Sequence, residues 1–257
     1  VSDSGSTDSE STDSDSDTTN SYYNGATIPT SGHPSLQAAI NAAADRDIVV
    51  VDDTHTLSNT VSLKANIKLE GGGGVIQAAD GSHADLIRVD EVSNVWIDGL
   101  TLDGRYPDGG EGVRCLGGAS VGNIHNIRIT NCTIENAGYQ GVELQVKDGR
   151  TIEDIYIANN RVENVRSHGI LVGLKNGSVL RDVLIEGNTV INADRAQSIG
   201  CFGQGSTFAE NVAIIGNTTQ RDSSQGSAGP HMALEENVRN SLIYGNSLNG
   251  HSDGQNG

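Results

Sequence analysis

Asn94-Val95-Trp96-Ile97-Asp98-Gly99 returns later in the chain as Asp182-Val183-Leu184-Ile185-Glu186-Gly187, in the pattern Asn or Asp, aliphatic, any residue, aliphatic, any residue, Gly. Self-similarity at a fixed period is the signature of a solenoid, in which each repeat packs on its neighbours. The spacings between successive copies are 28, 32, 28, 28, 29 and 29 residues. The copies begin at Asn66, Asn94, Asn126, Asp154, Asp182, Asn211 and Asn240.

A second short strand lies midway between the copies, as in Gly141-Val142-Glu143-Leu144 and Gly169-Ile170-Leu171-Val172. Each repeat thus holds several strands of 3–5 residues separated by Gly or Asn turns, and no repeat contains a helical pattern. The pattern predicts an all-β fold, a right-handed parallel β-helix of six or seven coils whose strands stack about 4.8 Å apart. One inward column should form a ladder of side-chain amides: Leu100, Cys132, Asn160, Asn188, Asn217 and Asn246.

The chain divides into three parts. Residues 1–20 are rich in Ser, Asp and Thr and contain no basic residue, so we expect a disordered tail or linker. Residues 21–47 hold a lead-in and a capping helix, with Ser35 as N-cap before the apolar spacing of Leu36, Ala39 and Ile40. Residues 48–257 form the β-helix, which we expect to be open at its C-terminal end.

The composition narrows the function classes. The chain has 257 residues, with 33 acidic against 16 basic side chains and a net charge of −17. Such a surface repels nucleic acid and anionic membranes, and no stretch approaches the length of a membrane span. Few of the basic residues are Lys, and Asp outnumbers Glu, which indicates a halophilic, haloarchaeal protein. We expect it to be secreted or on the cell surface, and the three Cys to be core residues.

From about residue 30 to 250 the chain resembles the pectate-lyase-like superfamily of right-handed β-helix proteins. The resemblance includes Ser35–Ile40 leading to Ile48–Val51, which is similar to the capping helix and first strand of that superfamily. Leu100–Gly104 and the loop 105–111 resemble the early coils of alginate C5-epimerases. Ser167-His168-Gly169 is similar to the Gly-His-Gly of polygalacturonases. The resemblance implies the fold, and it leaves lyases, hydrolases, epimerases, tailspikes and adhesins open.

The superfamily's catalytic motifs are not intact. Alginate epimerases carry Tyr-Gly-Phe-Asp-Pro-His on one strand, where this chain reads Gln140-Gly141-Val142-Glu143-Leu144-Gln145. Glu143 stands at the Asp position, but Gln145 stands at the His position and cannot do acid–base chemistry. The Asp pair of polygalacturonases and the Arg and calcium-binding acids of pectate lyases are also missing.

Chemistry alone still gives a candidate site on the outer face of the middle strands. Aligning the repeats puts Glu143 and His168 one coil apart, about 5–8 Å from each other, with Arg114 one coil before Glu143. An acid, an imidazole and a guanidinium could abstract a sugar proton and neutralise a neighbouring carboxylate. The alternative is that Arg114–Glu143 is a cross-strand ion pair and His168 a turn residue. Binding residues on the same face would be Gln140, Gln145, Gln197 and Phe202.

Two further sites are predicted on weaker sequence grounds. Asp103, Asp108 and Glu111 lie around a Gly-rich loop and could bind Ca²⁺ through oxygen ligands, although a solvated turn is the simpler interpretation and no other cofactor is expected. Asn176 begins the sequon Asn176-Gly177-Ser178 in a loop and is the glycosylation candidate.

Three functions remain open. The first is an extracellular, non-catalytic subunit of a filament, appendage or virion-like assembly, which contacts copies of itself or another surface protein through the open last coil and the tail. The second is a polysaccharide-modifying enzyme (uronan lyase, epimerase or glycoside hydrolase) acting through Glu143, His168 and Arg114. The third is a glycan-binding adhesion module. The first is placed ahead because the last coil is expected to be open and the tail could pair with a neighbour. The enzyme is placed second because few aromatic residues, Phe202 and Tyr139, are expected on the candidate face.

Overall fold

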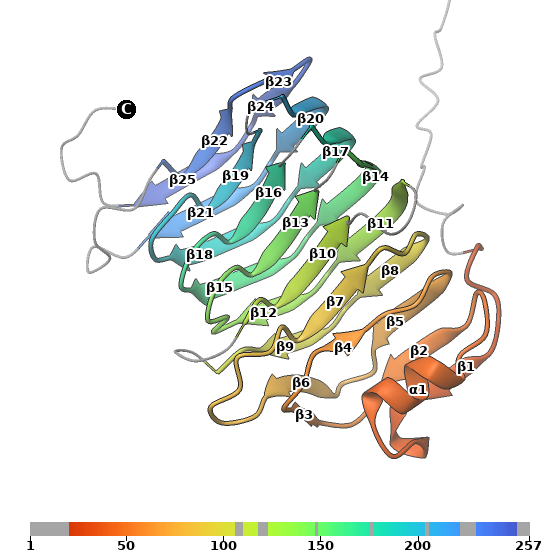
Figure 1. Cartoon of the computed structure of the whole chain (residues 1–257). Coiled ribbons are helices and arrows are strands. Elements are labelled where there is room, and N and C mark those ends of the chain that lie inside the picture. Colours follow the sequence, from red (N-terminus) through yellow and green to blue (C-terminus); the bar gives the residue numbers. More distant parts are fainter. Residues whose placement is uncertain are drawn as a thin grey trace, which may run out of the picture.

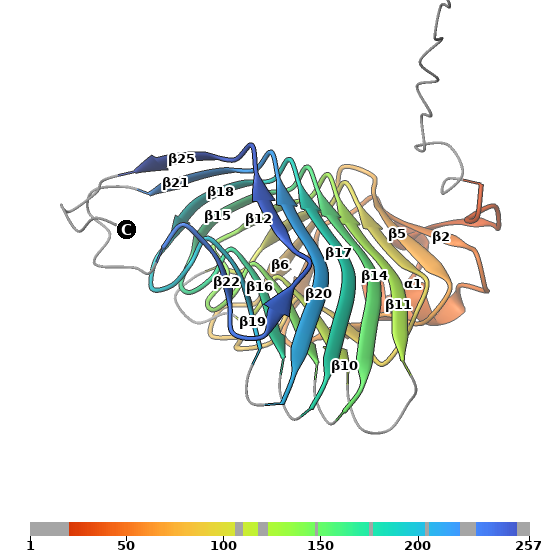
Figure 2. The same cartoon turned by 90° about the horizontal axis from the view of Figure 1, so that it is seen from above.

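Three parallel sheets run side by side along a single solenoid (Figures 1 and 2). The computed structural model describes residues 21–105, 110–117, 123–146, 149–174, 177–203, 206–221 and 230–250. Each coil contributes one strand to each sheet, and every strand pair in the described residues is parallel. The prediction of an all-β parallel β-helix is therefore confirmed.

The first sheet contains the repeated Asn/Asp motif, and the strands of the second sheet follow it in each coil. The third sheet is formed by the strands midway between two copies of the motif, and we call it the middle sheet. The first sheet comprises β1 (Thr27–Pro29), β2 (Ile48–Val51), β5 (Ile67–Gly71), β8 (Val95–Asp98), β11 (Ile124–Thr130), β14 (Thr151–Ala158), β17 (Val179–Glu186), β20 (Phe208–Ile215), β23 (Val238–Arg239) and β24 (Leu242–Tyr244). The second comprises β3 (His55–Leu57), β6 (Val75–Ala78), β9 (Thr101–Asp103), β12 (Thr133–Glu135), β15 (Arg161–Val165), β18 (Thr189–Ala193), β21 (Thr218–Arg221) and β25 (Ser247–Gly250). The middle sheet comprises β4 (Val61–Ser62), β7 (Ile87–Asp90), β10 (Val113–Gly117), β13 (Val142–Val146), β16 (Ile170–Leu174), β19 (Ile199–Phe202) and β22 (Met232–Glu235).

The repeated Asn and Asp residues mark a sharp corner of each coil. All seven have a positive φ, between 49° and 61°, a left-handed conformation that Asn and Asp tolerate better than most residues. Gly99 and Gly187, five residues after the corner, also have positive φ values of 65° and 63°. The spacing of the motif is therefore a backbone requirement of the corners.

Four strands of the first sheet, β11, β14, β17 and β20, have 7 or 8 residues, which is longer than the expected 3–5. The reason is that pairing continues through the corner residue. Ile152 pairs with Leu180 before the corner, and Ile155 pairs with Val183 after it. These strands are the long curved ribbons of Figure 2.

The predicted amide ladder is present inside the coils. Asn160 Nδ2 donates to Asn188 Oδ1 at 2.9 Å, and Asn188 Nδ2 donates to Asn217 Oδ1 at 3.0 Å. The same Oδ1 atoms accept the backbone N–H of the preceding Asn, at 2.9 Å in both cases. Buried polar groups are thereby hydrogen-bonded at every step, as a close-packed interior requires.

Helix α1 (Leu36–Ala42) covers the N-terminal end of the core (Figure 1). Ser35 Oγ accepts the N–H of Ala38 at 3.1 Å, as an N-cap does. Leu36, Ala39 and Ile40 are buried in the same cluster as the aliphatic residues of the sheets. The strand β1 precedes this helix and pairs with β2, so the first sheet begins ahead of the division at residue 48. The tail, residues 1–20, lies outside the described residues.

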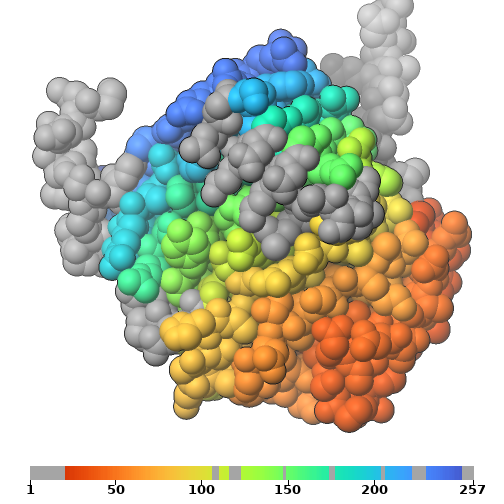
Figure 3. Space-filling view, in the orientation of Figure 1, coloured from red at the N-terminus to blue at the C-terminus, as the bar shows by residue number. Residues whose placement is uncertain are grey.

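The coils follow one another in sequence order from the helix to β25, as the colours of Figure 3 show. Cys115, Cys132 and Cys201 are buried and unpaired, so they are core residues as predicted. Burial raises the pKa of each thiol to about 12. No helix in the described part of the chain is long and apolar enough to cross a bilayer.

Candidate functional site

A groove of about 770 Å³ runs over the outer face of the middle sheet. Its position follows from the register, because Arg114 pairs with Glu143 and then Leu171 in one column, and Gln145 with Gly173 and Phe202 in the next. Its lining contains both polar side chains and aromatic rings: Arg114, Tyr139, Gln140, Glu143, Gln145, His168, Leu171, Gly173, Gln197, Phe202, Gly203, Glu235 and Glu236.

Gly173 leaves open space in this groove because it has no side chain. A Cβ built at this residue would meet no atom within 4 Å, which identifies open space above the strand. The residues beside it in the same column are Gln145 and Phe202, both large. The glycine therefore leaves a depression between an amide and an aromatic ring.

A cluster of charged side chains lies at the β7 and β10 end of the groove. Arg114 Nε is 2.9 Å from Glu143 Oε2, and Arg114 also lies 3.7 Å from Asp85 and 3.9 Å from Glu111. Arg88 contacts Asp85 at 2.7 Å. The three acidic side chains are only 5–7% exposed, so they depend on the two guanidinium groups and on each other for solvation.

Glu111 and Asp85 share a proton. Burial, reinforced by the hydrogen bond to Asp85 and by its negative charge, raises the pKa of Glu111 from 4.5 to about 8. Burial acts in the same direction on Asp85, but hydrogen bonds from Glu111 and Arg88 outweigh it and lower the pKa of Asp85. At neutral pH Glu111 is thus protonated and donates to the Asp85 carboxylate.

A second series of polar contacts begins at His168. Its Nε2 lies 2.8 Å from Gln197 Oε1, and its Nδ1 lies 3.2 Å from Ser167 Oγ. An amide oxygen can only accept, so Nε2 carries the proton and Nδ1 accepts from the Ser167 hydroxyl. Gln197 Nε2 then donates to Glu235 Oε1 at 3.2 Å. Burial lowers the pKa of His168, which keeps the ring neutral at pH 7.

Phe202 packs beside this histidine, with ring centres 5.5 Å apart. All seven residues predicted for the site are in the lining of this one groove. The structure joins Arg114 and Glu143 as an ion pair, whereas His168 contacts Gln197 instead of Glu143. Both ring nitrogens of His168 are engaged by protein groups. The catalytic roles of Glu143, His168 and Arg114 stay predictions.

Asp85 and Arg88 were not predicted from the sequence, and they extend the site by one coil. Arg88 pairs with Arg114 in register, and Glu111 N–H donates to Asp85 Oδ1 at 3.3 Å. The signal was the alternation of apolar and polar residues in Ile87–Asp90. It was hidden because this strand follows Leu86, whereas the compared strands follow Gly112, Gly141 and Gly169.

The calcium site stays a prediction, and two of its three candidate residues lie beside different sheets. Asp103 accepts from Arg105 N–H and Asn136 Nδ2 at 3.0 Å beside the second sheet, whereas Glu111 faces Asp85 at the middle sheet. Asp108 lies outside the described residues, as does the glycosylation candidate Asn176. Across the described ranges, no group of three His, Cys, Asp or Glu side chains could hold a metal ion.

No model of a known protein family matches the chain, and no curated protein matches it either. Among solved structures, ORF18 of Geobacillus virus E2 superposes with a TM-score of 0.57 and 14% identity, over 86% of this chain and 52% of the viral one. This chain thus spans about half the length of that protein.

Two enzymes of the pectate-lyase-like β-helix type are also among the structural neighbours. Polygalacturonase from Erwinia carotovora has a TM-score of 0.46 and 10% identity, over 84% of this chain and 89% of the enzyme. The A-module of mannuronan C-5 epimerase AlgE4 from Azotobacter vinelandii has a TM-score of 0.44 and 18% identity, over 86% of this chain and 88% of the module. At such identities the likeness extends to the fold alone.

Proposed function

We propose that this chain binds an extended, neutral polysaccharide in the groove over the middle sheet. The observation that carries the proposal is the groove itself, which runs from Arg114 on β10 to Glu235 on β22. Four strand steps at about 4.8 Å give it a length of about 19 Å. This suits several sugar units of a chain laid across the strands.

The lining has the chemistry that sugars need. The lining carries three amides, which suit hydroxyl groups because an amide can donate and accept. Gln140 and Gln145 are buried, so Gln197 is the amide most open to a sugar. Phe202 and Tyr139 offer rings to the apolar faces of sugars, and Tyr139 is 52% exposed. The depression at Gly173 lies between these groups.

Charge favours a neutral ligand over a uronan. The groove holds three acidic side chains, Glu143, Glu235 and Glu236, against the single guanidinium of Arg114. The chain as a whole, groove residues included, has a net charge of −17. A polyanion would be repelled unless high salt screened it. Binding of a neutral glycan should depend little on salt.

Binding is favoured over catalysis by the contacts of the candidate catalytic groups. His168 uses both ring nitrogens within the protein, and Glu143 is held by Arg114 and by Gln145 Nε2 at 3.4 Å. A general base must be within reach of the substrate proton, and the Glu143 side chain is only 5% exposed. The glycan-binding module is therefore the preferred function, with the polysaccharide-modifying enzyme as the alternative at the same groove.

The experiment is a titration of the protein with a panel of neutral polysaccharides and uronans by affinity electrophoresis. Gly173→Trp should abolish binding, because the new side chain fills the groove from a position with room for its Cβ. Gly32→Trp is the matched control, since a Cβ there also meets open space and Gly32 lies in the lead-in, away from the groove. Equal binding by both variants would refute the proposal.

A second candidate, a subunit of a surface assembly, is favoured by one observation. The strands β24 and β25 expose four large apolar side chains, Leu242, Ile243, Tyr244 and Leu248, at 41–67%. Exposed apolar patches of this kind commonly mark protein contacts. Light scattering at increasing protein concentration tests it. Wild-type protein should self-associate and Tyr244→Asp should not, whereas a monomer at all concentrations would contradict it.

We also propose that the protein works outside the cell at high salt, because its surface is acidic and poor in Lys. The unfolding midpoint in urea should then rise from low to molar NaCl. A midpoint that falls with salt would argue against this setting.

A further inference from the structure

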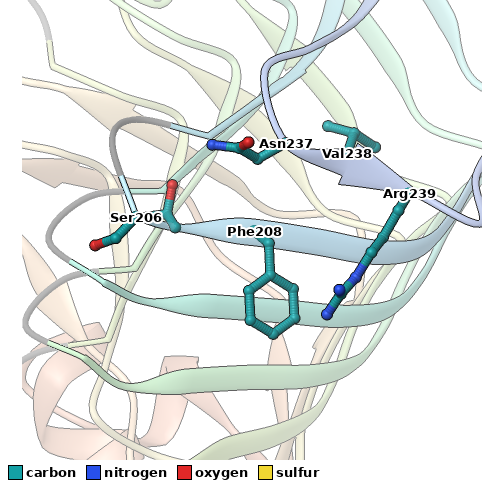
Figure 4. A pocket seen from close by; sticks show the side chains of 6 residues that line it. Ser206, Phe208, Asn237, Val238 and Arg239 are labelled. Atoms are coloured by element: carbon teal, nitrogen blue, oxygen red, sulfur yellow. The ribbon is translucent and has the colours of Figure 1, made fainter.

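A smaller pocket of about 320 Å³ lies around the corner from the groove, on the outer face of the first sheet. Its lining comes from the start of β20 and from the turn before β23: Ser206, Thr207, Phe208, Asn237, Val238 and Arg239. Figure 4 shows the Phe208 ring hanging from β20, with Arg239 beside it at one end and Ser206 and Asn237 at the other. We call this the corner pocket.

The corner pocket and the groove are lined by neighbouring residues that follow β19 and β22. Gly203 and Glu236 line the groove, whereas Ser206 and Asn237 line the corner pocket. The two segments are in contact, because a Cβ at Gly203 would lie 2.9 Å from Thr207 Oγ1 and 3.1 Å from Glu236 O. Backbone bonds join them, with Gly203 N–H donating to Glu235 O at 3.3 Å and Ala209 N–H to Asn237 O at 3.2 Å. The groove and the corner pocket therefore adjoin at the ends of β19 and β22.

Arg239 is fixed in place by two contacts. Its guanidinium carbon lies 4.1 Å from the centre of the Phe208 ring, and its Nε lies 3.3 Å from Glu210 Oε2. These contacts occupy the guanidinium face and the Nε edge. The terminal nitrogens form a fork of donors that suits two neighbouring hydroxyl groups.

The rest of the corner pocket complements a sugar. Phe208 and Val238 supply apolar surface, and Ser206 and Asn237 are exposed polar residues at the opposite end from Arg239. Aromatic, hydroxyl, amide and guanidinium groups in one concave site are the combination that sugar rings require. Arg239 is the sole charged residue of the lining, and Glu210 balances it.

We propose that the corner pocket is a distal subsite that binds one further unit of the neutral glycan held in the groove. The inference rests on the proposed function and deepens it. The bound chain would bend at the β19 and β22 end of the groove, from the outer face of the middle sheet towards that of the first sheet. The subsite then makes affinity depend on chain length, because only a chain longer than the groove reaches Arg239.

The test is a calorimetric titration with neutral oligosaccharides of graded length, taken from the polysaccharide that binds best. Wild-type affinity should rise again once the oligosaccharide exceeds the groove. Arg239→Met should remove about tenfold of that gain, as the loss of one or two hydrogen bonds predicts, and leave short-chain affinity unchanged. Arg181→Met is the matched control, because Arg181 contacts the same Glu210 at 3.8 Å and is outside the pocket lining.

Backbone hydrogen exchange gives a second readout. Long oligosaccharides should slow exchange at residues 206–210 and 237–239, and short ones should not. Equal length dependence in wild type and Arg239→Met, without such protection, would overturn the subsite while short-chain binding upheld the groove. A wild-type protein that binds no oligosaccharide of any length would overturn both.

Discussion

Replacing Glu111 by Gln should change how the stability of this protein depends on pH. Glu111 is buried beside Asp85, and burial with the Asp85 contact raises its pKa from 4.5 to about 8. Gln has the shape of the protonated acid, can still donate to Asp85, and does not titrate. The variant therefore keeps the neutral-pH contacts and removes one ionisation.

The sign follows from proton linkage. A group with a pKa raised by folding binds its proton more tightly in the folded state, so its contribution is fully present below pH 4.5 and is lost as the pH rises through 8. A rise from 4.5 to about 8 corresponds to about 5 kcal/mol, and relaxation around the new charge reduces the measured loss to about 3 kcal/mol. The lowered pKa of Asp85 acts below this range, because its contribution is lost only as the pH falls below 3.8.

The assay is urea unfolding of wild type and Glu111→Gln at pH 4, 7 and 9 and at fixed salt. The two free energies of unfolding should agree at pH 4, and the variant should be more stable by about 3 kcal/mol at pH 9. The lowered pKa values of His168 and His231 affect both proteins alike and cancel in the difference. Glu153→Gln, on the first sheet, should follow wild type at every pH. Parallel curves for wild type and Glu111→Gln would refute the shared-proton account.

Three further predictions concern the ladder and the groove. Asn188→Ala should lower the free energy of unfolding by about 3 kcal/mol, because it removes hydrogen bonds to Ile157 O and Asn217 and leaves the N–H of Asn160 without its acceptor. The control Gln77→Ala, on the second sheet, should cost under about 1 kcal/mol. Equal losses of the two variants in urea unfolding would contradict the role of the ladder. Arg114→Met should cost about 3–5 kcal/mol in the same assay at pH 7, because it leaves Glu143 buried without its cation; a loss below about 1 kcal/mol would show that the pair is solvated. His168 should titrate below 6.5 in an NMR pH series, and Gln197→Leu should lower its midpoint further, because the Gln197 hydrogen bond raises this pKa; a midpoint above 6.5 would contradict the burial of the ring.

The fold was predictable because the sequence repeats its backbone requirements. The Asn or Asp at each corner takes a left-handed conformation, and its spacing of 28–32 residues sets the length of a coil. Asn160, Asn188 and Asn217 could be placed in one inward column for the same reason, since parallel register carries a position from coil to coil. Once the period was known, the columns over the middle sheet followed from counting.

The site was less predictable, since it depends on side-chain contacts across coils. The alignment placed Arg114 next to Glu143 but did not predict that the Glu143 carboxylate is buried. Asp85 escaped notice because its strand lacks the leading Gly of later coils, and with it the shared proton of Glu111. The corner pocket was not foreseen either, because it arises where β20 and the turn before β23 meet, which a repeat pattern does not describe.

The central claim is that the groove over the middle sheet holds a neutral glycan. Diffraction from crystals soaked with the best-binding oligosaccharide tests it most directly. The account predicts sugar density along the outer face of β13, β16 and β19, with a ring against Phe202 and hydroxyl groups within hydrogen-bond distance of Gln145 and Gln197. Sugar density on another face of the solenoid, with the groove of a binding-competent protein left empty, would contradict it.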